Sequence, residues 1–145
     1  MTWTYPRKLA SHAQVAGAPL HHVKPHGALY NQADRDEHFA AAVVAGITRV
    51  SSRVLLYALP GSKLAAAGIA AGLAICPEGF ADRRYLPNGS LMPRNEPGAV
   101  IKDTETALAQ ALQLIASGKI KTLCVHGDGP NAVAILRAIR EKLVS

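Results

Sequence analysis

Hydrophobic and polar positions along the chain alternate between the spacing of helices and that of strands. Apolar residues recur at helical intervals in five segments, which are residues 8–17, 33–50, 62–72, 104–117 and 131–143. Four short apolar runs between them predict strands, which are residues 20–23, 53–59, 73–76 and 120–125. Helices and strands are therefore expected in strict alternation, with a helix at each end.

Strands that are separated by helices cannot pair through tight hairpins, so right-handed crossovers and a parallel sheet are expected. The predicted fold class is α/β, built from parallel βα repeats. Ser62 is well placed to cap the third helix. Two segments, 24–31 and 77–97, are expected to be loops, and the second is longer than most connections between packed elements.

Composition places the chain among ordinary globular proteins, since 49% of its 145 residues are hydrophobic and 18% are charged. Its length suits one domain with a buried core. No apolar run approaches the roughly 20 residues that span a bilayer, and the first residues, with Trp3 and Tyr5, do not form a signal peptide. We therefore expect a cytoplasmic protein without membrane contact.

Charge and cysteine usage argue against a nucleic-acid-binding protein and against a cysteine-based metal site. The formal charge of +6 comes from basic residues that are scattered and not interleaved with aromatic ones, so nucleic acid is not an expected partner. Cys76 and Cys124 have no metal-ligand spacing, and both are expected to be buried thiols.

Titratable side chains gather in three of the four loops that follow the predicted strands, where active sites of parallel α/β folds lie. The remaining loop, 60–62, offers a helix start suited to an anion but lacks the Walker spacing. The candidates are Lys24 and His26 in the first loop, Glu78, Asp82, Arg83 and Arg94 in the third, and His126 and Asp128 in the last.

Each candidate has a catalytic and a structural interpretation. An imidazole after a strand suits acid/base chemistry, although His26 could instead brace its loop. Lys24 could bind a carboxylate or phosphate or be solvated. Glu78, Asp82 and Arg83 could form an acid/base and anion-binding group or a salt bridge that fixes the loop. Arg94 could bind an anion or pair with Glu96. His126 and Asp128 could share a proton or a metal, or Asp128 could instead cap the last helix.

Four motifs occur in an order that is similar to one known family. They are VKPHGALYN at 23–31, EGFADRRY at 78–85, LMPR at 91–94 followed by PGAVIKD at 97–103, and CVHGD at 124–128. Together they resemble the LamB/YcsF family. The resemblance covers residues 7–145, expected to form a single α/β domain, and leaves residues 1–6 as a leader without a counterpart.

The resemblance implies part of an irregular β/α barrel of the polysaccharide-deacetylase type. It implies the A subunit of a 5-oxoprolinase, which hydrolyses a cyclic amide, 5-oxo-L-proline, to L-glutamate with ATP as co-substrate, together with subunits B and C. Phosphorylation of the lactam oxygen would make it a good leaving group and permit attack by water. His26, Glu78, Asp82, His126 and Asp128 would be catalytic, whereas Lys24, Arg83 and Arg94 would bind substrate or phosphate.

The sequence departs from the family in two places. The D-x-N-x-D-x-G-E, H-x-G-D and A-H-P-G motifs that open family members are absent, and the connection from Gly118 to the last strand is short. Two alternatives to the A subunit of a 5-oxoprolinase therefore remain. One is a non-catalytic remnant that binds the partner subunits or itself. The other is a deacetylase-like hydrolase with His126, Asp128 and His26 around a divalent metal.

Overall fold

The computed structural model describes residues 4–144, and side chains from residue 7 onward. Residues 1–3 of the expected leader lie outside the described residues. Residues 4–6 open the first helix, α1 (Thr4–Val15), which begins earlier than the predicted segment 8–17. Contacts divide the chain into two compact units, one ending at Cys76 and the other beginning at Pro77.

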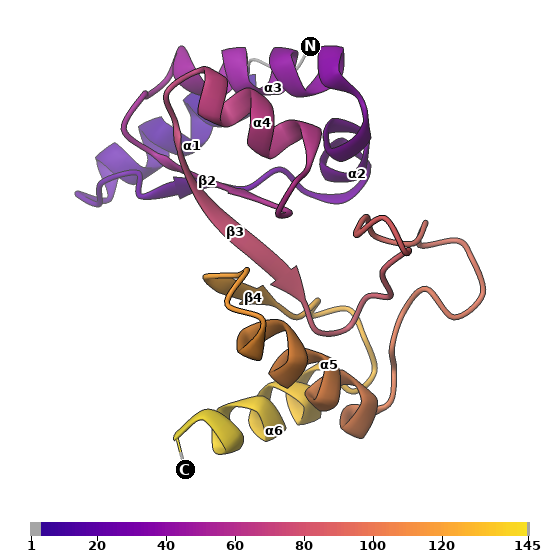
Figure 1. Cartoon of the computed structure of the whole chain (residues 1–145). Coiled ribbons are helices and arrows are strands. Elements are labelled where there is room, and N and C mark those ends of the chain that lie inside the picture. The colour runs from indigo at the N-terminus through magenta and orange to yellow at the C-terminus, as the bar shows by residue number, and fades with distance from the viewer. Residues whose placement is uncertain (1–3, 145) are drawn as a thin grey trace. The chain divides into compact units, whose positions relative to one another are not determined.

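Between residues 4 and 76, the first unit contains the parallel strands β1 and β2, the start of a third strand and the helices α1 to α4 (Figure 1). The parallel strands are β1 (His22–Val23) and β2 (Leu55–Ala58), with His22 opposite Leu55. Its other helices are α2 (Gly27–Arg35), α3 (Glu37–Thr48) and α4 (Lys63–Ala70). Ser62 caps α4 as expected, because its Oγ accepts a hydrogen bond from the Ala65 N–H at 3.0 Å.

Two expectations for residues 24–50 were wrong. The segment 24–31 is not a loop throughout, because α2 begins at Gly27, whose φ of +58° suits glycine. The single helix predicted over 33–50 is two helices separated at Asp36. The Asp36 backbone is extended, and its carboxylate accepts the Phe39 N–H at 2.9 Å, so it starts a new helix instead of continuing the old one.

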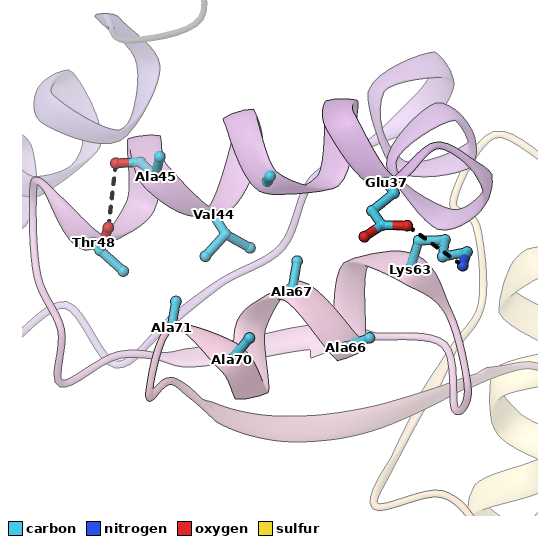
Figure 2. A pocket seen from close by; sticks show the side chains of 10 residues that line it. Glu37, Val44, Ala45, Thr48, Lys63, Ala66, Ala67, Ala70 and Ala71 are labelled. Carbon is cyan, nitrogen blue, oxygen red and sulfur yellow. Dashed lines mark hydrogen bonds and ion pairs between the residues drawn. The ribbon is translucent and has the colours of Figure 1, made fainter.

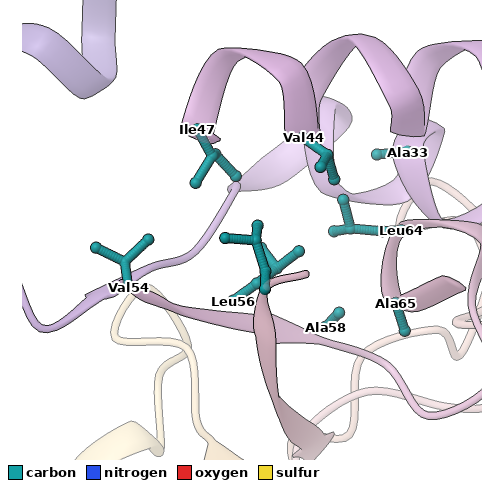
Figure 3. Packing of buried hydrophobic residues seen from close by; sticks show 9 residues of the cluster. Ala33, Val44, Ile47, Val54, Leu56, Ala58, Leu64 and Ala65 are labelled. Atoms are coloured by element: carbon teal, nitrogen blue, oxygen red, sulfur yellow. The ribbon is translucent and has the colours of Figure 1, made fainter. Parts of the chain in front are cut away.

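The core of the first unit lies between β2 and the helices α2, α3 and α4 (Figure 3). Leu56 and Ala58 point into it from β2, and Val44 and Ile47 point into it from α3. All four side chains are at most 3% exposed. Alternating inward positions on the strand and helical spacing on α3 are the patterns that the sequence showed.

The second unit pairs the end of β3 (Ala74–Phe80) in parallel with β4 (Thr122–Cys124). The helices α5 (Thr104–Ala116) and α6 (Ala132–Val144) pack side by side (Figure 1). Both helices were predicted, with ends within one residue. Their buried positions form a second core with Ala81 and Ile101, to which they contribute Ala107, Ala111, Ile135 and Ile139.

Strand β3 extends further than the predicted run 73–76. Proline has no N–H to donate, but the Pro77 carbonyl accepts the Lys121 N–H at 2.8 Å and the pairing with β4 continues to Phe80. Glu78 therefore lies in a strand and not in the expected loop. The α/β class with parallel βα repeats is confirmed. Among residues 4–144, no helix is long and apolar enough to cross a membrane.

Candidate active site

Two neighbouring strand ends bring Asp82 and His126 together. Phe80, the last residue of β3, lies opposite Cys124, the last residue of β4, and the Ala81 N–H donates to the Cys124 carbonyl at 3.0 Å. Parallel strands end at the same edge, so the segments that follow them leave side by side. Asp82 and His126 each lie two residues beyond such an end.

The Asp82 carboxylate holds His126 through its backbone and its ring. The His126 N–H donates to Oδ2 at 2.8 Å, and Nδ1 lies 3.1 Å from both Oδ1 and Oδ2. The Phe80 ring stacks on the imidazole, with 5.7 Å between ring centroids. The Asp82 side chain is 5% exposed, whereas the His126 side chain is 27% exposed, so the imidazole is the member of the pair that solvent reaches.

Burial by itself would raise the pKa of Asp82. Hydrogen bonds from the His126 side chain and backbone, together with attraction to that ring, outweigh burial and hold the pKa below its ordinary value. Asp82 is therefore ionised near neutral pH and can only accept hydrogen bonds. This assigns the proton of a neutral His126 to Nδ1 and leaves a lone pair on Nε2, the arrangement of a general base.

The EGFADRRY motif holds two further titratable side chains, of which Tyr85 is half-buried and Glu78 is buried. The Tyr85 hydroxyl accepts the Phe80 N–H at 2.7 Å, and burial raises the pKa of Tyr85 to about 12, so the phenol stays neutral. Glu78 is 2% exposed in β3. Glu78 is therefore far less accessible to a substrate in solvent than His126 is.

The two arginines of the site differ in exposure. Arg83 is 3% exposed, and its Nη2 donates to the Met92 carbonyl at 2.7 Å. Burial, followed by the nearby Arg94, lowers the pKa of Arg83. Arg94 is exposed, and its Nη2 lies 2.6 Å from Asp128 Oδ2. The structure therefore pairs Arg94 with Asp128 and not with Glu96, and it pairs His126 with Asp82 and not with Asp128.

Lys24 and His26 belong to the first unit. His26 is exposed and precedes α2 with an extended backbone, and its side chain makes no capping hydrogen bond. The neighbouring side chains of His21 and His22 lie close together, with 3.3 Å between their Nδ1 atoms. His21 lies just before β1, outside the regular strand, and alternation does not apply to it.

A hollow of about 610 Å³ lies between α3 and α4 (Figure 2). Alanine side chains make up most of its lining. Its polar side chains bond within and between the two helices. The Thr48 hydroxyl donates to the Ala45 carbonyl at 3.3 Å, and the exposed Lys63 pairs with Glu37 at 3.8 Å. Because of this lining, we place the candidate chemistry at Asp82 and His126.

A metal centre would need several ligating side chains close together. Between residues 4 and 144, no group of three or more His, Cys, Asp or Glu side chains could hold a metal ion. The nitrogen and oxygen atoms of His126 and Asp82 that face each other are engaged in their mutual hydrogen bonds. Asp82 and His126 therefore do not provide the ligand set of a resident metal.

Three contributors to the site were not predicted from the sequence. Phe80 and Tyr85 stand inside the quoted motif, but nothing in the motif distinguished them from ordinary packing residues. Gln110 lies on α5, and its Nε2 donates to backbone carbonyls on both sides of Asp82. In the sequence it is a polar residue between Ala109 and Ala111 and belongs to no motif. What distinguishes Gln110 is its half-buried position beside buried residues of the same helix, and that position is known only from the tertiary structure.

A model of the LamB/YcsF family matches residues 6–145. The chain belongs to the LamB/YcsF family. The expected family is thereby confirmed. The chain is 46% identical over 147 residues to the A subunit of 5-oxoprolinase from Symbiobacterium thermophilum, covering 93% of this chain and 56% of that protein. It is 46% identical over 149 residues to the A subunit of 5-oxoprolinase from Methylococcus capsulatus, covering 94% of this chain and 57% of that protein.

The LamB/YcsF fold is also seen in a solved structure. The crystal structure of a lactam utilization protein from Thermus thermophilus matches with a TM-score of 0.80 and 38% identity. The match covers 94% of this chain and 59% of that structure. The parallel βα repeats expected for part of an irregular barrel therefore have a counterpart in the family. This LamB/YcsF chain spans a little over half the length of the relatives it matches.

Proposed function

We propose that this chain forms part of the A subunit of a cytoplasmic, ATP-dependent 5-oxoprolinase, in which His126 is the general base and acid. The observation that carries the proposal is the Asp82–His126 pair, in which a buried carboxylate orients a partly exposed imidazole. Membership of the LamB/YcsF family and relatives named as 5-oxoprolinase A subunits support the choice of substrate.

The chemistry of the pair suits the opening of a lactam. A phosphoryl group moves from ATP to the lactam oxygen, ADP leaves, and the carbonyl carbon becomes more electrophilic. Water adds to that carbon while His126 Nε2 takes its proton. The ring C–N bond then breaks, its electrons stay on nitrogen, and the imidazolium returns the proton to that nitrogen, while the added hydroxyl group loses its proton to solvent as the carbonyl re-forms. A second water releases phosphate from the resulting acyl phosphate and leaves L-glutamate.

Asp82 supports both directions of this proton transfer. Its carboxylate fixes the tautomer that leaves Nε2 ready to accept a proton, and its negative charge stabilises the imidazolium that forms. The cationic groups suited to the substrate carboxylate or to phosphate are Lys24, Arg83 and Arg94. Arg94 is the more exposed arginine, and release from Asp128 would give its guanidinium a new anionic partner.

The experiment mixes this chain with subunits B and C and measures ADP release that depends on 5-oxo-L-proline. We expect activity with the chain and none without it. His126→Ala should lower the rate by about 10²- to 10⁴-fold, the usual contribution of a general acid/base. Lys24→Ala should likewise lose activity through weaker anion binding. Lys121→Ala, which removes an exposed lysine before β4, is the matched control for the loss of a cation.

Two results would contradict the proposal. Wild-type turnover in His126→Ala would remove the assigned base. Turnover that is the same with and without the chain, while circular dichroism shows a folded protein, would favour the non-catalytic interaction module instead.

A further inference from the structure

Gln110 joins α5 to the segment that carries Asp82. Its Nε2 lies 2.8 Å from the Phe80 carbonyl, 3.1 Å from the Ala81 carbonyl and 2.8 Å from the Arg83 carbonyl. A side-chain amide has two hydrogens, so three acceptors share two donors. One side chain thus holds both neighbours of Asp82 in the backbone, from a helix that begins more than 20 residues later.

Two of these carbonyls belong to deeply buried residues. Ala81 and Arg83 are each at most 3% exposed, so water does not easily replace the amide there. The Asp82 carbonyl, which Gln110 does not contact, accepts the Ile101 N–H at 2.9 Å. A buried carbonyl without a partner is costly, so removal of Gln110 would favour rotation of these peptide units.

Besides its packing against α6, helix α5 has two contacts that bear on the place of Gln110. Asp103 caps the helix by accepting the Thr106 N–H at 2.7 Å. On the strand side, a Cβ on Gly79 would lie 3.2 Å from Leu114 Cδ1, so the absence of a side chain there lets α5 approach β3 closely. Gln110 lies one turn before Leu114 and reaches the residues just after Gly79.

The segment held by Gln110 supplies two groups that contact the His126 ring. Asp82 holds Nδ1, and Phe80 stacks on the ring face. A shift of this segment would therefore change two things, the hydrogen bond from Asp82 that selects the tautomer and the packing of the ring on Phe80. Catalytic geometry tolerates such shifts poorly, since displacement by about 1 Å can cost roughly 10²-fold in rate.

We propose that Gln110 is a positioning residue that sets the tautomer and orientation of His126 by fixing the backbone on both sides of Asp82. The catalytic consequence rests on the function proposed above, whereas the structural consequence does not. Gln110 contacts neither substrate nor the reacting atoms in this scheme, and it acts only through Asp82 and Phe80.

The first test measures the tautomer of His126 by ¹⁵N NMR of the ring nitrogens in the full chain. In the unmodified protein the proton should reside mainly on Nδ1. Gln110→Met keeps the length of the side chain and removes both donors, and the ratio of the Nδ1–H to the Nε2–H form should fall about tenfold. Gln113→Met is the matched control, because Gln113 is an exposed glutamine one turn later on the same helix.

The second test needs no variant and therefore does not depend on the folding of Gln110→Met. Hydrogen exchange of the side-chain amide protons should be at least about tenfold slower at Gln110 than at Gln113, because only the former is held by buried acceptors. Equal exchange at the two side chains would overturn the proposal. So would an unchanged His126 tautomer in a folded Gln110→Met protein.

Activity separates this inference from the proposed function. In the complex with subunits B and C, Gln110→Met should lower kcat by about 10- to 100-fold and leave KM unchanged. If His126→Ala turned over normally while Gln110→Met still shifted the tautomer, the proposed function would fail and the positioning role would stand. If the tautomer did not move, the positioning role would fail whatever the activity.

Discussion

Replacement of Asp82 by alanine should destabilise the protein by about 3 kcal/mol. The carboxylate accepts one hydrogen bond from the His126 backbone and one from its ring, and hydrogen bonds to a charged group contribute about 1.5–3 kcal/mol each. Because the His126 ring is 27% exposed, water recovers part of the loss at Nδ1. We therefore take the lower end of the sum.

Thermal unfolding at pH 7, followed by circular dichroism, converts this free energy into a measurable shift. A protein of about this size loses roughly 2–4 °C in Tm per kcal/mol, so Asp82→Ala should lower Tm by about 6–12 °C. Asp128→Ala is the matched control, since it removes an aspartate whose side chain is 61% exposed in its pair with Arg94. That pair should contribute no more than about 1 kcal/mol.

The pH dependence has a defined sign. The pKa of Asp82 is lower in the folded protein than its ordinary value, so its contribution is present above the unfolded pKa and is lost as the pH falls through the folded pKa. The stability gap between wild type and Asp82→Ala should be steady from pH 7 to about 5 and should close below about pH 4. Equal Tm losses for Asp82→Ala and Asp128→Ala would refute the reasoning, as would a gap that persists unchanged at about pH 2.

Two further predictions concern the first unit. Gly68→Ala should lower the free energy of unfolding by about 1–3 kcal/mol in urea titrations, because its Cβ would lie 2.7 Å from Ile75 Cδ1 and 2.8 Å from Leu56 Cδ2; a gain in stability, as helix propensity alone predicts, would contradict this close packing. Ser62→Ala should cost about 1 kcal/mol through loss of the α4 cap, whereas Ser62→Thr should retain most of it. Equal losses in both variants would show that the hydroxyl does not cap the helix.

The sequence by itself determined the fold class and most of the helices. Local spacing is enough for these, because apolar periodicity follows directly from the geometry of helices and strands. It placed α5 and α6 within one residue of their ends, and it named both Asp82 and His126. It failed at Asp36 and Pro77, where one side-chain cap and one strand pairing override the local apolar pattern.

Only the tertiary structure decided which candidates act together. His126 has Asp128 two residues away in the sequence, yet its partner is Asp82, which is 44 residues away, because β3 and β4 end side by side. Arg94 likewise pairs with Asp128 and not with its neighbour Glu96. Gln110 carries no local signal at all, since its role depends on three carbonyls presented by a strand end more than 25 residues earlier. Hydrogen-bond partners are chosen by proximity in space, and proximity of this kind comes from strand register and helix packing, which no single segment encodes.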